Sequence, residues 1–186
     1  MLRIRFLILA LPFVALSAGE SSAQIEKGDS QISLQGSLST SVGQPTGSQT
    51  SGSVGGTYGY FLTRQIAIRG TAYLNVSRTS AGGGEDGSGA ANDISGLYGA
   101  GVELDLTGAG QKFVPYLAFE ALTLSSAQAG QSSMILGPSV GARAFVSRST
   151  AFDVALRYQT TSDNVNVGTV QTTFGFSYFF GSDRRR

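Results

Sequence analysis

The sequence predicts an all-β fold, an eight-stranded antiparallel up-and-down transmembrane β-barrel. Three observations lead to this prediction. Apolar residues alternate with polar or small residues in eight separate runs, which is the period of a strand with two different faces. The connections between the runs are alternately short and long, as in an up-and-down meander. The charged residues within the runs share one face, opposite the apolar side chains.

The first residues of the chain differ from the rest. Arg3 and Arg5 precede an apolar stretch at 6–16, and small residues follow up to Ala23. This order predicts a secretory signal peptide, because the apolar stretch is too short to span a bilayer. An N-terminal membrane anchor is the alternative. The predicted divisions are a signal peptide at 1–23, a barrel at 24–180 and a basic C-terminal tail at 181–186.

The composition excludes several kinds of site. Charged residues make up 13% of the chain, and Cys and His are both absent. Without Cys there is no disulfide framework or thiolate metal site, and without His the commonest general base is missing. Removal of residues 1–23 leaves 11 basic and 11 acidic residues. We therefore expect no cofactor, no metal, no nucleic-acid partner and no enzymatic activity.

The first four predicted strands are joined by one short and two long connections. Alternation begins with Ile32 and Leu34 between polar neighbours, and it recurs in three further runs. The four strands cover approximately 31–38, 54–62, 66–76 and 98–106. A short polar turn around Arg64 separates the second and third, whereas the segments at 42–51 and 77–93 are long and rich in Gly, Ser and Thr. The acidic part of the second segment could bind calcium, but a solvated loop is expected.

The last four predicted strands continue the same plan. They cover approximately 113–121, 136–146, 152–158 and 174–180. Short turns lie at 107–111 and 147–150, and longer connections lie at 125–132 and 162–166. Pro138 removes a backbone donor from the sixth strand, which predicts a bulge or the outer end of that strand. Because the number of strands is even, both termini of the mature chain are predicted to lie on the short-turn side.

The charged residues decide which face is outside. In a soluble lipocalin-like barrel the apolar face would be the interior, and the outer face would be rich in Lys and Glu. A basic residue on a lipid-facing surface costs about 2–4 kcal/mol near the midplane, which fits the strict separation seen here. The sequence therefore predicts that apolar side chains face lipid and that ionised side chains fill the lumen. The predicted lumen network comprises Arg69, Glu103, Asp105, Glu120, Arg143, Asp153 and Arg157.

One charge pair within this network can be placed more closely. Arg143 and Asp153 lie at similar distances from the turn around Arg148, so they are predicted to face each other across a hairpin, where opposite charges are favourable. Because buried charges without partners are costly, we expect an ionic and hydrogen-bonded plug.

Three stretches resemble the small eight-stranded outer-membrane β-barrel family of Gram-negative bacteria, which includes outer-membrane protein A-type and opacity-protein-like barrels. They are "GYFLTRQIAIRG" at 59–70, "FDVALRYQTT" at 152–161 and "TFGFSYFF" at 173–180. The last is similar to the C-terminal signal that the barrel assembly machinery reads in this family. Six residues follow the final aromatic, whereas such chains commonly end there. The resemblance assigns the assembly signal to Thr173, Gly175, Tyr178 and Phe180.

The resemblance implies a non-enzymatic protein of the bacterial outer membrane, in contact with membrane lipid. It implies a structural role in the cell envelope or interactions through surface loops, and a monomer. A small porin-like solute channel and a loop-mediated, surface-antigen-like adhesin are the alternatives, and a soluble lipocalin-like barrel is a weaker one. Hydrolases of this family use a catalytic His, which the chain lacks. The tail at Arg184–Arg186 is expected to be solvated, although contact with anionic headgroups or with periplasmic partners is the alternative.

Overall fold

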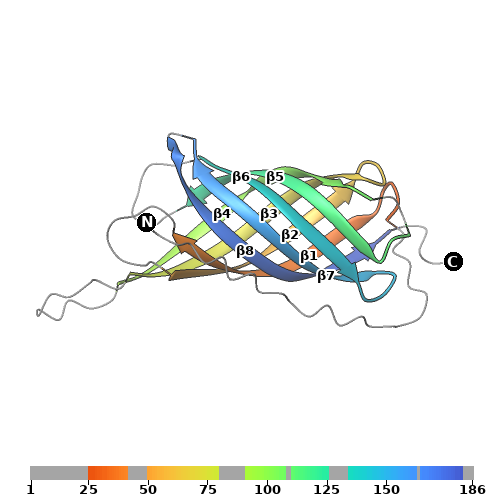
Figure 1. Ribbon diagram of the computed structural model, residues 1–186, viewed down its shortest axis with the longest axis horizontal. Coiled ribbons are helices and arrows are strands. Elements are labelled where there is room, and N and C mark those ends of the chain that lie inside the picture. Colours follow the sequence, from red (N-terminus) through yellow and green to blue (C-terminus); the bar gives the residue numbers. More distant parts are fainter. Residues whose placement is uncertain are drawn as a thin grey trace, which may run out of the picture.

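The computed structural model describes residues 25–41, 50–79, 91–107, 110–125, 134–162 and 164–181. These residues form one closed barrel of eight strands that are inclined to its long axis (Figure 1). The predicted signal peptide, the tail beyond Gly181 and most of the acidic connection after β3 lie outside the described residues. The strands are β1 (Ser30–Ser41), β2 (Thr50–Phe61), β3 (Ile66–Thr79), β4 (Ala91–Asp105), β5 (Phe113–Ser125), β6 (Met134–Phe145), β7 (Thr150–Thr161) and β8 (Asn164–Phe180).

Every strand pairs antiparallel with its neighbours in sequence, and β1 pairs with β8 to close the sheet. The closing pair begins with Ser30 opposite Phe180, so the start of the first strand and the end of the last strand meet on the short-turn side. Closure leaves no strand edge unpaired, which is the condition for a sheet surrounded by hydrocarbon. The predicted fold class is thereby confirmed.

The last strand departs from its predicted extent. β8 begins at Asn164, ten residues before the predicted start, so the connection from β7 is two residues long. Apolar residues change phase between Val167 and Val170, which hides the start of the strand from a search for strict alternation. The β7–β8 register shifts where Thr160 pairs with Gly168 and Thr161 pairs with Asn164. This irregularity accommodates the change of phase.

Pro138 is the fifth residue of β6 and lies neither at a bulge nor at the outer end of the strand, contrary to the prediction. The register between β5 and β6 is continuous, with Pro138 opposite Phe119. The pairing with β7 omits Gly137 and Pro138 and resumes in the same register at Ser139. Because proline has no N–H, the ladder loses bonds there without an extra residue.

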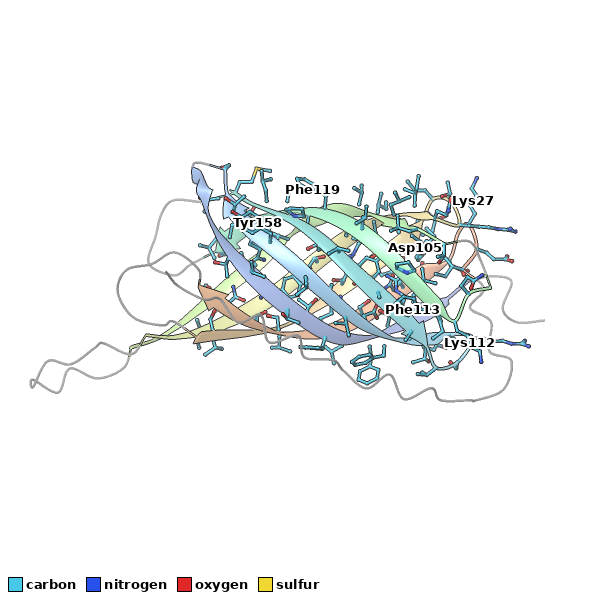
Figure 2. All side chains as sticks on the ribbon, viewed as in Figure 1. Lys27, Asp105, Lys112, Phe113, Phe119 and Tyr158 are labelled. Atoms are coloured by element: carbon cyan, nitrogen blue, oxygen red, sulfur yellow. The ribbon has the colours of Figure 1, made fainter. Side chains whose placement is uncertain are left out.

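The two faces of the wall have opposite character. Outward-pointing residues are large and apolar along every strand, and Phe119 and Tyr158 can be seen on the outside in Figure 2. On β3 this surface extends from Ile66 to Val76, which corresponds to about 25 Å of height for a strand tilted by about 40°. An exposed apolar belt of this height matches the apolar band of a membrane barrel.

Among the residues that the structure describes, no helix has the length and apolar character needed to cross a membrane.

Candidate functional site

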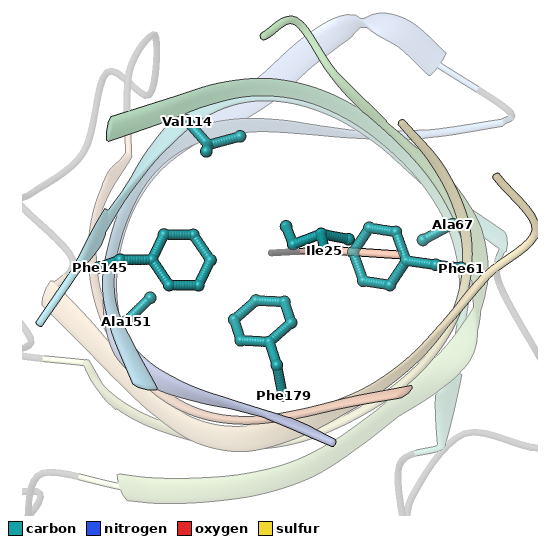
Figure 3. Packing of buried hydrophobic residues seen from close by; sticks show 7 residues of the cluster. All are labelled: Ile25, Phe61, Ala67, Val114, Phe145, Ala151 and Phe179. Atoms are coloured by element: carbon teal, nitrogen blue, oxygen red, sulfur yellow. The ribbon is translucent and has the colours of Figure 1, made fainter. Parts of the chain in front are cut away.

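The lumen is the candidate functional site, and at its short-turn end it is closed by apolar side chains. Phe61, Phe145 and Phe179 point inward from the ends of three strands and converge with Ile25 on the barrel axis (Figure 3). The Phe145 and Phe179 ring centroids are 5.1 Å apart, and those of Phe61 and Phe179 are 6.1 Å apart. These residues, with Ala67, Val114 and Ala151, form what we call the apolar cap.

The N-terminal segment 25–29 holds Ile25 inside the cap. The Gly28 backbone N–H donates to the Phe61 carbonyl oxygen at 2.8 Å, and the Phe61 N–H donates to the Asp29 carbonyl oxygen at 2.9 Å. Gly28 has a φ of 90°, a conformation that glycine adopts without steric cost, so the chain turns back across the barrel mouth. The Asp29 carboxylate accepts a bond from the Glu26 N–H. Ile25 is consequently only 3% exposed.

Above the cap lies a node centred on Arg143. Its Nη2 is 2.7 Å from Glu103 Oε1, its Nε is 2.9 Å from Asp153 Oδ1, and its Nη1 is 3.2 Å from Asp105 Oδ1. Tyr116 flanks the guanidinium, with its ring centroid 4.8 Å from Cζ. Arg143 is fully buried, and Asp153 is its partner in the β6–β7 register, as predicted. Three carboxylates, two from β4 and one from β7, therefore share one cation.

A second node joins the remaining charged residues. Arg69 Nη1 is 2.8 Å from Glu103 Oε2, and Arg69 Nη2 is 3.6 Å from Glu120 Oε1. Arg157 Nη2 is 2.9 Å from Glu120 Oε2 and donates to the Tyr73 hydroxyl at 2.7 Å. Because Glu103 contacts both Arg69 and Arg143, all seven predicted lumen residues belong to one connected network. Each of them is at most 5% exposed.

Hydroxyl and amide groups complete the network across the closing seam. Ser177 donates to the Asp153 carboxylate, and its hydroxyl also bonds the Ser33 hydroxyl at 2.7 Å and accepts from Gln31 at 2.8 Å. Further along, the Tyr73 hydroxyl donates to Gln35 Oε1 at 2.9 Å. These bonds connect β1 and β8 with β3 and β7, so the lumen cross-links strands that are not neighbours in the wall.

Paired side chains occupy the barrel interior. The carboxylates are engaged by arginine, and no group of three His, Cys, Asp or Glu side chains suited to a metal occurs in the described ranges. Ionic groups in the middle and aromatic rings at one end occupy the cross-section, as expected for eight strands. What this lumen can do is exclude solvent and hold the wall together.

The four residues assigned to the assembly signal lie on both faces of β8. Thr173 is buried inside, and Gly175 also faces inward, where an added Cβ would meet Gln35 and the Leu34 carbonyl oxygen. Tyr178 and Phe180 point outward at the short-turn end, 55% and 38% exposed, with ring centroids 6.3 Å apart.

Sequence reasoning missed the apolar residues of the interior. It treated the inward face as mostly small and polar, yet the cap and a second cluster of Tyr73, Leu97 and Leu122 are inside. A signal was present for the cap: Phe61 and Phe179 each adjoin outward-facing apolar residues and thus break the alternation. Consecutive apolar residues at the short-turn end indicate a residue on each face.

Comparisons with known proteins support the fold. Neisserial surface protein A shares 16% identity with this chain at a TM-score of 0.62, covering 83% of this chain and 100% of its own. The outer membrane protein OprG of Pseudomonas aeruginosa shares 14% at a TM-score of 0.59, covering 86% and 99%. The N-terminal β-barrel domain of OprF from the same species shares 16% at 0.52, covering 83% and 98%. No family model matches the chain, and no curated protein does.

Proposed function

We propose that the chain is a non-enzymatic, integral β-barrel protein of the bacterial outer membrane, with a structural role in the envelope or a role in interactions through its surface loops. The observation that carries this proposal is the inverted distribution of side chains. Large apolar residues cover the outer wall, whereas buried charges and aromatic rings fill the lumen. Such a surface is unstable in water and stable in lipid. The fold shared with outer-membrane barrels supports the same proposal.

Fractionation and gel mobility test the membrane assignment. We expect the protein in the outer-membrane fraction, migrating faster without boiling than after boiling, because a closed hydrogen-bonded barrel resists detergent until heated. Recovery in the soluble periplasmic fraction without a mobility shift would instead favour a lipocalin-like barrel. Cross-linking in detergent tests the proposed monomer, and depletion of the barrel assembly machinery tests its part in insertion.

The filled lumen supports a plug rather than a pore. Arg143 and Glu103 pair inside the barrel, and the apolar cap lies between them and the short-turn opening. Ions would have to displace both layers to pass. Single-channel recording of the purified protein in planar bilayers should show no steady conductance steps. Reproducible steps would assign a small solute channel.

Two assays address the remaining activities. Purified protein should show no lipid deacylase or protease activity above background, since a His-dependent site is not available in this sequence. Deletion of each long connection, followed by binding to host cells or matrix proteins, tests the interaction role. Loss of binding in one deletion would identify an adhesin loop, whereas unchanged binding would favour the purely structural role.

A further inference from the structure

The short-turn end of the barrel carries a ring of cations. Each of the three short turns contains one basic residue, and the N-terminal segment contains a fourth. Lys27 and Lys112 can be seen pointing away from this end in Figure 2. All four are exposed, and because they belong to alternate connections they are distributed around the circumference. We call them the basic ring: Lys27, Arg64, Lys112 and Arg148.

Few carboxylates accompany this ring. Among the described residues of the N-terminal segment and the three short turns, the acidic side chains are Glu26 and Asp29. Asp29 is only 5% exposed and Glu26 is half-buried, whereas the four cations of the ring are all exposed. The connections at the other end, 42–49, 80–90, 126–133 and 162–163, contain three carboxylic residues and no Lys or Arg. The two ends of the barrel therefore differ in charge.

The basic ring borders the apolar belt directly. Arg64 lies between Leu62 and Ile66, which are 44% and 42% exposed on the outer wall. Lys112 precedes the outward-facing Phe113, which is 45% exposed. In a membrane the belt ends where hydrocarbon ends, and the long stems of Lys and Arg place their charges at headgroup level.

We propose that the basic ring binds the anionic phospholipid headgroups of the leaflet that faces the short turns, a proposal that rests on the outer-membrane assignment. Cations spaced around the whole circumference match the annulus of lipid that surrounds a barrel. A protein partner would contact a patch on one side instead. Attraction of basic side chains to an anionic surface falls off within a Debye length, so the ring acts on adjoining lipids and also fixes the level of the barrel in the bilayer.

Electron spin resonance with headgroup-matched, spin-labelled lipids tests this proposal. The protein is reconstituted in phosphatidylcholine, and the association of labelled phosphatidylglycerol is measured relative to labelled phosphatidylcholine. One cation at a membrane surface corresponds to roughly a fivefold preference. Averaged over the annulus, we expect phosphatidylglycerol to be favoured about twofold or more, and the preference to decline with added salt.

The decisive variant combines Lys27→Gln, Arg64→Gln, Lys112→Gln and Arg148→Gln, and it should bind both lipids equally. The control Arg78→Gln removes one charge near the other end of β3 and should retain the preference. Gel mobility before boiling establishes that each variant is folded and inserted, which separates failure of this proposal from failure of the membrane assignment.

Should the fourfold variant not fold, Arg64→Gln with Arg148→Gln should halve the preference, and Arg64→Lys with Arg148→Lys should keep it. An unchanged preference in the folded fourfold variant would overturn the proposal. So would a wild type without lipid preference that binds a polyglutamate peptide in detergent, because that result would assign the ring to an acidic protein partner.

Discussion

Replacing Arg143 with alanine should destabilise the barrel more than replacing any exposed arginine with alanine. The guanidinium is the common partner of Glu103, Asp105 and Asp153, with N–O distances of 2.7, 3.2 and 2.9 Å. It also lies against the Tyr116 ring. The substitution leaves three carboxylates facing one another inside the wall, of which only Glu103 has a second arginine nearby.

The magnitude follows from the burial of the pair. Removing one partner of a buried ion pair costs about 3–5 kcal/mol, because the remaining charge is left uncompensated. The space vacated by Arg143 can admit water to the carboxylates, which places the expected loss near the lower limit, at about 3 kcal/mol. Arg143→Lys keeps the charge but lacks the planar fork that reaches three carboxylates, so its loss should be intermediate.

Urea unfolding in lipid vesicles, followed by gel mobility without boiling, measures these free energies. In zwitterionic phosphatidylcholine vesicles, which offer the basic ring no anionic headgroups, Arg148→Ala is the matched control, since Arg148 is exposed and surface substitutions usually change stability by less than about 0.5 kcal/mol. Combining Arg143→Met with Glu103→Gln should recover part of the loss. The reasoning is refuted if Arg143→Ala costs no more than Arg148→Ala, because the network would then contribute nothing to the folded state.

Three further experiments test separate features of the wall. Ile68→Arg places a charge on the lipid-facing belt and should cost about 2–4 kcal/mol of unfolding free energy in vesicles; an unperturbed midpoint would contradict the orientation of the wall. Gly99→Ala brings a Cβ against a backbone carbonyl of β5, whereas Gly70 has open space around it. Gly99→Ala should therefore cost about 1–3 kcal/mol of unfolding free energy, and Gly70→Ala far less. Equal losses would exclude a steric requirement for glycine at position 99. Tyr178→Ala with Phe180→Ala should slow insertion by the assembly machinery while leaving spontaneous folding in detergent intact, and equal slowing of both would point to stability rather than recognition.

The sequence predicted the wall of the barrel well, because lipid on one side and a narrow lumen on the other restrict which side chains each face of a strand can carry. Alternation around Ile66 and Ile68 determined which residues face outward, and the position of Arg143 relative to its turn determined its partner Asp153. Charged side chains on such a wall are tolerated only on the lumen face. Their positions in the alternation therefore show which face of each strand is inside.

The interior beyond those charges was not predictable in the same way. Ile25 enters the cap through a reversal at Gly28, and nothing in the alternation of β1 indicates that the preceding segment folds inward. Arg69 and Arg157 share Glu120 although they belong to β3 and β7. Contacts across a lumen depend on how far each strand is staggered around the cylinder, and a local pattern does not contain that quantity.

The seam between β1 and β8 has a consequence for how the chain could be rearranged. Ser30 and Phe180 are opposite each other in the register at the short-turn end, so the order of strands around the barrel is circular and has no unique starting point. A circular permutant that joins residue 181 to residue 25 through a short linker and opens at 126–133 would keep every strand pairing and the N-terminal segment of the apolar cap. The position of the chain ends is thus expected to affect export and insertion, and not the strand pairing of the folded barrel.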